Sequence, residues 1–115
     1  MKWKTLLFGL VLVGCSSQIT ATLSDDVASW QRYGEQRASD GHIVQSEQKL
    51  VMHSLSGVVT AEQYLAYLDG YQVGKEKYCA QSASMLGRIG KPYRGICDDI
   101  NPFFRSDYNN ARREW

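Results

Sequence analysis

The sequence has few of the residues that most often carry catalysis or bind metal. Among its 115 residues are two histidines, His42 and His53, and three cysteines. The two histidines lie in no His-Glu-x-x-His motif or other paired ligand spacing, so we expect surface positions for both. A Gly-x-Ser-x-Gly elbow and a Walker-type phosphate loop are also missing. We therefore expect no catalytic residue, no metal and no cofactor.

The sequence also lacks a charge excess and a long apolar run. It has 13 Lys and Arg against 12 Asp and Glu, and such a balance gives no electrostatic case for nucleic-acid binding. Spanning a bilayer takes about 20 apolar residues, and the longest run, near the start of the chain, is much shorter. A permanent membrane-spanning helix is therefore not expected.

The first fifteen residues have the pattern of a secretory leader. Lys2 and Lys4 precede an uncharged, mostly apolar run over 5–13, which is typical of a signal peptide. Leu12-Val13-Gly14-Cys15 then resembles the lipobox of bacterial lipoproteins. That resemblance implies cleavage before Cys15, diacylglyceryl attachment to its thiol and acylation of the new amine. An ordinary signal peptide that happens to contain a cysteine is the alternative.

The same resemblance sets the expected domain boundaries and location. Residues 1–14 would be the signal peptide, 15–23 a lipidated tether and 24–115 a small folded domain. Ser16 stands where an aspartate typically marks inner-membrane retention, so the chain is similar to lipoproteins sent to the outer membrane, facing the periplasm. Without the lysines of the leader, 11 basic residues face 12 acidic ones, a net charge of about −1.

The remaining cysteines, Cys79 and Cys97, form an even pair. In an oxidising compartment we expect them to be joined in a disulfide. The bridge would close a loop of about 19 residues and contribute roughly 3 kcal/mol by the loop-entropy estimate. A metal pair and a redox pair are the alternatives, although the spacing is not Cys-x-x-Cys and no histidine is adjacent.

The patterning predicts an all-α domain of about four helices around an aromatic-rich core, with no alternating stretch long enough for a strand. The first helix should begin with Ser24 as N-cap and end near Asp40-Gly41. A weaker helix is expected over 43–56. The last should begin at Asn101-Pro102 and carry an apolar stripe, Phe104, Tyr108, Ala111 and Trp115.

The third helix has the strongest signals. Thr60-Ala61-Glu62-Gln63 is a capping box, and an aromatic stripe follows, formed by Tyr64, Tyr67, Leu68, Tyr71 and Tyr78. Beside the stripe runs a ridge of small residues: Ala66, Gly70 and Gly74. Because a helical glycine costs about 1 kcal/mol against alanine, the ridge predicts a second backbone packed closely against it. A ligand groove walled by tyrosines is the alternative.

The segment between the two cysteines is rich in glycine. We expect a helical turn at 82–88 and otherwise irregular chain, broken by Gly87, Gly90 and Gly95 with Pro92 between them. Three cations at a spacing of three, Arg88, Lys91 and Arg94, could form an anion-binding site with exposed glycine amides. A solvated loop face is the alternative.

An ordered set of motifs resembles one family. Trp30, Asp40-Gly41, Tyr67-x-x-Gly70-x-x-x-Gly74, Tyr78-Cys79, the glycine-rich segment to Cys97, and Phe103-Phe104 with Tyr108 follow one another. This order is similar to the small bacterial lipoproteins of domain of unknown function 2799. Many members have Cys-Pro where this chain has Cys97-Asp98. The family has no known activity, so the resemblance implies no catalytic residue.

Two functional hypotheses follow. The first is a non-catalytic binding or structural module of the cell envelope, attached to the membrane by its lipid and engaging an envelope protein or glycan. The second is a small enzyme acting on peptidoglycan or lipids, which would need a paired acid and base in a cleft.

Overall fold

The computed structural model describes residue 23 and residues 25–113. Five helices make up this part of the chain: α1 (Val27–Ser39), α2 (Glu47–Val51), α3 (Ala61–Cys79), α4 (Ala83–Arg88) and α5 (Pro102–Arg112). An isolated parallel bridge pairs Leu23 with Ser54. The all-α prediction is confirmed, with five helices in place of about four because 82–88 contains a short helix. The helix expected over 43–56 is reduced to 47–51.

The helix boundaries follow from local hydrogen bonds. Asp26, and not Ser24, caps α1, because its carboxylate accepts a hydrogen bond from the Ala28 amide at 3.2 Å. The capping box of α3 is confirmed: the Gln63 amide donates to the Thr60 hydroxyl at 3.1 Å, and the Thr60 amide donates to the Gln63 side chain at 2.9 Å. The helix stop at Gly41 is also confirmed, since its φ of 82° is one that glycine readily adopts.

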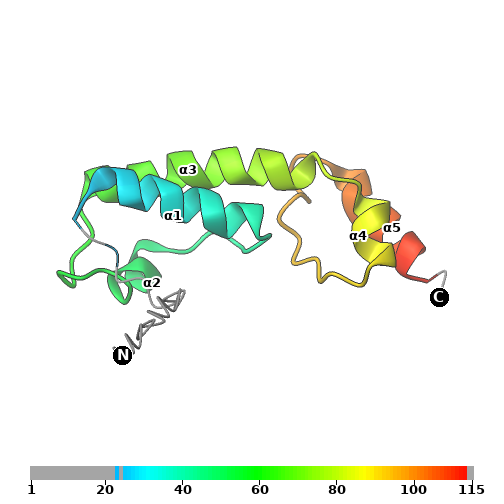
Figure 1. Cartoon of the computed structure of the whole chain (residues 1–115), viewed down its shortest axis with the longest axis horizontal. Coiled ribbons are helices and arrows are strands. Elements are labelled where there is room, and N and C mark those ends of the chain that lie inside the picture. The colour runs from blue at the N-terminus through cyan, green and yellow to red at the C-terminus, as the bar shows by residue number, and fades with distance from the viewer. Residues whose placement is uncertain (1–22, 24, 114–115) are drawn as a thin grey trace, which may run out of the picture.

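Helices α1 and α3 form a parallel pair whose backbones nearly touch (Figure 1). A Cβ atom placed on Gly70 would lie 1.8 Å from the carbonyl oxygen of Gln31, and one on Gly74 would lie 2.1 Å from that of Glu35. On α1, a Cβ atom placed on Gly34 would lie 2.1 Å from the carbonyl oxygen of Tyr67. The close backbone approach predicted from the small-residue ridge is therefore confirmed.

The tyrosines of α3 hold the segment that leads from α1 to α2. The Tyr71 hydroxyl donates to the His42 carbonyl at 2.7 Å, and the Tyr67 hydroxyl accepts from the Gln45 amide at 2.8 Å. The Tyr33 hydroxyl of α1 donates to the Gln45 side chain at 2.9 Å. Because Tyr67 and Tyr71 are buried beneath this segment, they act as packing residues and do not wall a groove.

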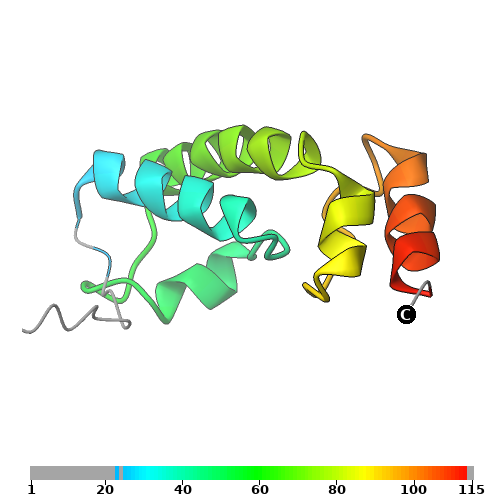
Figure 2. The ribbon, with the colours of Figure 1, turned by 45° about the vertical axis from the view of Figure 1, so that its right-hand side comes forward.

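Helices α4 and α5 form a second pair beyond the carboxyl end of α3 (Figures 1 and 2). Gly87 lies inside α4, where a Cβ would come 2.4 Å from the Tyr108 carbonyl of α5. The prediction that Gly87 breaks regular structure is therefore wrong, since the missing side chain lets two helices meet. Gly90 and Gly95 do lie outside helices, with φ of 75° and 92°. The buried apolar side chains of both pairs form one continuous cluster.

Candidate ligand-binding cleft

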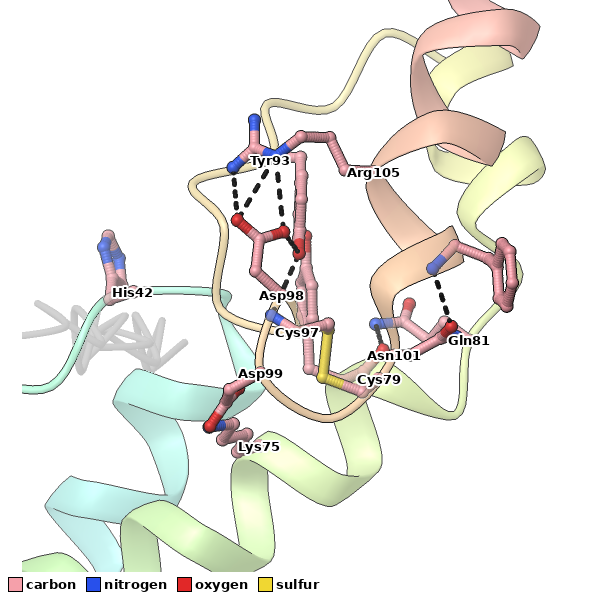
Figure 3. Close-up of a disulfide and its surroundings, with 12 residues drawn as sticks. His42, Lys75, Cys79, Gln81, Tyr93, Cys97, Asp98, Asp99, Asn101 and Arg105 are labelled. Carbon is pink, nitrogen blue, oxygen red and sulfur yellow. Dashed lines mark hydrogen bonds and ion pairs between the residues drawn. A yellow bond between two sulfur atoms is a disulfide. The ribbon is translucent and has the colours of Figure 1, made fainter.

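A disulfide joins the end of α3 to the loop that precedes α5. Cys79 and Cys97 are bonded, with their Cα atoms 5.7 Å apart (Figure 3). Cys97 is fully buried, so the bridge is a structural part of the core. The predicted disulfide is confirmed.

Beside the disulfide, Tyr93, Asp98 and Arg105 form a clamp (Figure 3). The Tyr93 hydroxyl donates to Asp98 at 2.8 Å and accepts from the Cys97 amide at 3.0 Å. Arg105 of α5 donates to both Asp98 oxygens, at 2.7 Å for the shortest contact, and its guanidinium lies 5.1 Å from the centre of the Tyr93 ring. Asp98 thus connects the loop to α5.

The clamp shifts the titration of both acids. The hydrogen bonds from Arg105 and then Tyr93 lower the pKa of Asp98 below its usual value. Burial, followed by the hydrogen bond to Asp98, raises the pKa of Tyr93 to about 12. At neutral pH the clamp is therefore a carboxylate held by a cation and a neutral phenol, an arrangement that stabilises the loop.

Two further contacts fix the loop. Asp99 pairs with Lys75 of α3 at 2.7 Å, and the Tyr108 hydroxyl of α5 donates to the Lys91 carbonyl at 2.7 Å. The predicted start of α5 is confirmed, because its cap is Asn101, whose side chain accepts from the Phe103 amide at 3.1 Å. Asp98 and Asp99 bind cations on α5 and α3, respectively.

The fixed loop, α4 and the ends of α1 and α3 surround a cleft of about 220 Å³. Helix α1 ends at Ser39 with Asp40 as its C-cap, and the Tyr78 ring of α3 packs against Gly41, which follows Asp40. The lining residues are Ser39, Asp40, Tyr78, Gln81, Leu86, Lys91, Pro92 and Arg94. They come from segments that are far apart in the sequence.

The cleft carries charges of both signs. Lys91 and Arg94 are exposed, and neither forms an ion pair with any residue of the described part of the chain. Asp40 accepts a hydrogen bond from Gln36 at 3.0 Å and contributes an acidic side chain to the lining. Burial raises the pKa of Tyr78, so its hydroxyl is protonated at neutral pH. These groups suit a small ligand with an anionic group and, near Asp40, a cationic one.

His42 lies beside this cleft, after Gly41. Burial first, and then the positive charges of Arg37 and Arg94, lower the pKa of His42 below 6.5, while Asp40 opposes them. The imidazole is therefore neutral at pH 7. His53 is exposed near Tyr33, with ring centroids 6.1 Å apart, and in residues 23 and 25–113 no group of His, Cys, Asp and Glu could hold a metal ion.

The predicted basic triplet is divided by the structure. Lys91 and Arg94 meet at the cleft, whereas Arg88 lines a separate hollow with Gly87, Ile89, Gly90 and Arg112. The separation arises because α4 continues through Arg88, so this side chain belongs to a helix end and not to the loop. Asp40 and Tyr78 were not identified as lining residues, although Asp40-Gly41 and Tyr78-Cys79 were recognised as motifs.

The predicted lipidation site, Cys15, and the leader that precedes it lie outside the described residues. Of the five helices that the structure describes, none is both long and apolar enough to cross a bilayer. Neither observation bears on the anchor, which the leader sequence alone predicts.

Comparison with known families agrees with the motif order. No curated protein and no solved structure is significantly similar to the chain. A family profile described as Protein of unknown function (DUF2799) matches residues 29–113, a span that includes all but the first two residues of the helix pairs, together with the disulfide and the cleft. The chain therefore belongs to the DUF2799 family of proteins of unknown function.

Proposed function

We propose that this protein is a lipid-anchored binding module of the bacterial cell envelope, without catalytic activity and facing the periplasm. The leader and the Leu-Val-Gly-Cys sequence ending at Cys15 support the anchor. The Cys79–Cys97 disulfide supports an oxidising compartment. A serine after Cys15 supports attachment to the outer membrane.

The observation that carries the binding role is the pair of exposed cations, Lys91 and Arg94, in a cleft that also contains Asp40. The envelope offers carboxylates on peptidoglycan peptides and phosphates on lipids. A volume of about 220 Å³ suits a few atoms of a peptide, and Asp40 would repel a multiply charged phosphate. We therefore favour a peptide of the cell wall that carries both a carboxylate and an amine.

The anchor is tested with Cys15→Ser in cells given a labelled fatty acid. The natural chain should take up the label and sediment with membranes. Cys15→Ser should lose both properties, because no thiol is left for alkylation. Labelling that persists in Cys15→Ser would refute lipidation at this residue.

The binding role is tested by calorimetry of the purified protein with a synthetic peptidoglycan stem peptide. Lys91→Gln with Arg94→Gln should weaken binding at least about 10-fold, since a hydrogen bond to a charged group contributes about 1.5–3 kcal/mol. Arg88→Gln is the matched control, because Arg88 lies in the other hollow, and it should bind normally. Equal losses in the two variants, or no binding by the natural protein, would contradict the proposed cleft.

A further inference from the structure

An apolar tip lies at the end of the domain away from α4 and α5. It consists of Met52, Leu55 and Val58, whose side chains are 82%, 67% and 59% exposed. They lie in the turn between α2 and α3 (Figure 1). Singly exposed apolar side chains are common on proteins, but three in one turn are typical of a contact surface.

Hydrogen bonds fix the backbone of this turn, and its three apolar side chains point into solvent. The Ser54 hydroxyl donates to the Val58 carbonyl at 2.8 Å, and the Gly57 amide donates to the Ser54 carbonyl at 3.2 Å. Ser54 itself is buried. Hydrogen bonds within the turn therefore fix its backbone, and the side chains of Met52, Leu55 and Val58 remain exposed to solvent.

The tether enters the domain at this turn. The Leu23 amide donates to the His53 carbonyl at 2.8 Å, and the Leu55 amide donates to the Leu23 carbonyl at 3.0 Å. Leu23 is buried there. Because eight residue steps separate Leu23 from Cys15, Leu23 lies within about 29 Å of the proposed lipid attachment even for a fully extended chain. The backbone hydrogen bonds from Leu23 to the turn keep the tip close to that attachment.

We propose that the apolar tip rests on the bilayer into which the lipids of Cys15 insert. This proposal rests on the anchor described above and adds an orientation: the tip faces the membrane, while α4, α5 and the cleft lie toward the far end. Between positions 47 and 62, which flank the tip, the charged residues are two acids, Glu47 and Glu62, and one cation, Lys49, so no basic patch surrounds the tip. The contact is thus an apolar one and requires no anionic lipid.

The orientation can be measured on the full-length lipidated protein with a single fluorescent label. In Leu55→Cys or Met52→Cys, the introduced thiol is the free one, since Cys15 is alkylated and Cys79 is bonded to Cys97. Phe103→Cys is the matched control: Phe103 is 70% exposed, as open as Leu55, but lies on α5. Each protein carries an environment-sensitive dye and is reconstituted into phosphatidylcholine vesicles containing a doxyl-labelled lipid quencher.

All three proteins should float with the vesicles, and the dye at 52 or 55 should be quenched several-fold more strongly than the dye at 103. Flotation with weak quenching at every position would overturn the orientation and leave the anchor intact. Equal quenching of the dyes at 55 and 103 would also overturn the orientation and leave the anchor intact. A dye at 55 that is shielded from water but not quenched by lipid would show that a protein segment covers the tip. Failure to float would instead refute the anchor, and the orientation with it.

Discussion

The two helix pairs are held together by different means. In the α1/α3 pair, Gly34, Gly70 and Gly74 let backbone meet backbone. The α4/α5 region has one such glycine, Gly87, and adds the disulfide and the Tyr93–Asp98–Arg105 clamp. The difference follows from length. Helix α3 has 19 residues and offers a long surface for packing, whereas α4 has 6, and helices so short are not stable without outside support.

The comparison makes the two regions sensitive to different changes. An added methyl group should disrupt the first region, because its helices have no space between them. Loss of a cross-link should loosen the second region, because its helices bury little surface on their own. Ring contacts lie within each region: Tyr67 packs with its neighbours on α3 and α1, while Tyr93 lies 4.9 Å from Phe104 and 5.6 Å from Tyr108 of α5. One further ring contact joins the two regions, with Tyr78 of α3 6.1 Å from Phe104.

The largest effect is expected for Gly70→Ala. In an open helix this change would stabilise by up to about 1 kcal/mol. Here the new Cβ would lie 1.8 Å from the Gln31 carbonyl oxygen, so α1 and α3 must separate and the free energy of unfolding should fall by about 3 kcal/mol or more. Urea unfolding followed by circular dichroism measures the loss. Asp69→Ala, one residue earlier and exposed, is the control, and equal stability of the two variants would contradict the close contact.

The next largest effect is expected when both cysteines of the disulfide are replaced by alanine. The bridge spans 18 positions, and its removal should lower the free energy of unfolding by roughly 3 kcal/mol. Hydrogen exchange locates the loss: amides of α4, α5 and the loop should exchange faster than those of α1 and α3. Uniform acceleration across both pairs would show that the two regions unfold as one.

The sequence predicted the first region better than the second. Glycines at a spacing of four, a capping box and a helix stop are local patterns, and all three are found in α1 and α3. Gly87 was misjudged because a glycine near the end of a short helix cannot be told from a breaker until its partner, the Tyr108 carbonyl, is known. The cleft was only partly foreseen, since Asp40 and Arg94 are brought together by the fold.

A smaller effect, confined to the second region, is expected for Tyr93→Phe. The ring stacking should persist, but the hydrogen bonds to Asp98 and from the Cys97 amide would be lost. A loss of about 1–2 kcal/mol follows from the usual worth of such bonds. Tyr64→Phe is the control, because its ring stacks at 6.3 Å from Tyr67 while its hydroxyl bonds to no residue within 23 and 25–113. If urea unfolding gave the same free energy of unfolding for the two variants, the hydrogen bonds of the clamp would not contribute to stability.

The smallest effect concerns pH and the junction of the two regions, where His42 faces Arg37 of α1, Arg94 of the loop and Asp40. Its pKa in the folded protein lies below 6.5, so the unfolded chain binds the proton more readily. Stability is therefore fully present above pH 6.5 and decreases as the pH falls through 6.5 toward the folded pKa. His42→Asn should lose less stability than the natural protein between pH 7.5 and 5.5.

The same pH experiment distinguishes two views of how the regions are coupled. If the repulsion from Arg94 contributes, Arg94→Gln should raise the pKa of His42, which NMR titration of the imidazole detects, and the stability of this variant should fall less at pH 5.5. If burial and Arg37 alone lower the pKa of His42, the imidazole should have the same pKa in Arg94→Gln as in the natural protein. Since Arg37 belongs to the first region and Arg94 to the second, a shift would show that a charge on the cleft loop is felt by the segment packed on α1 and α3.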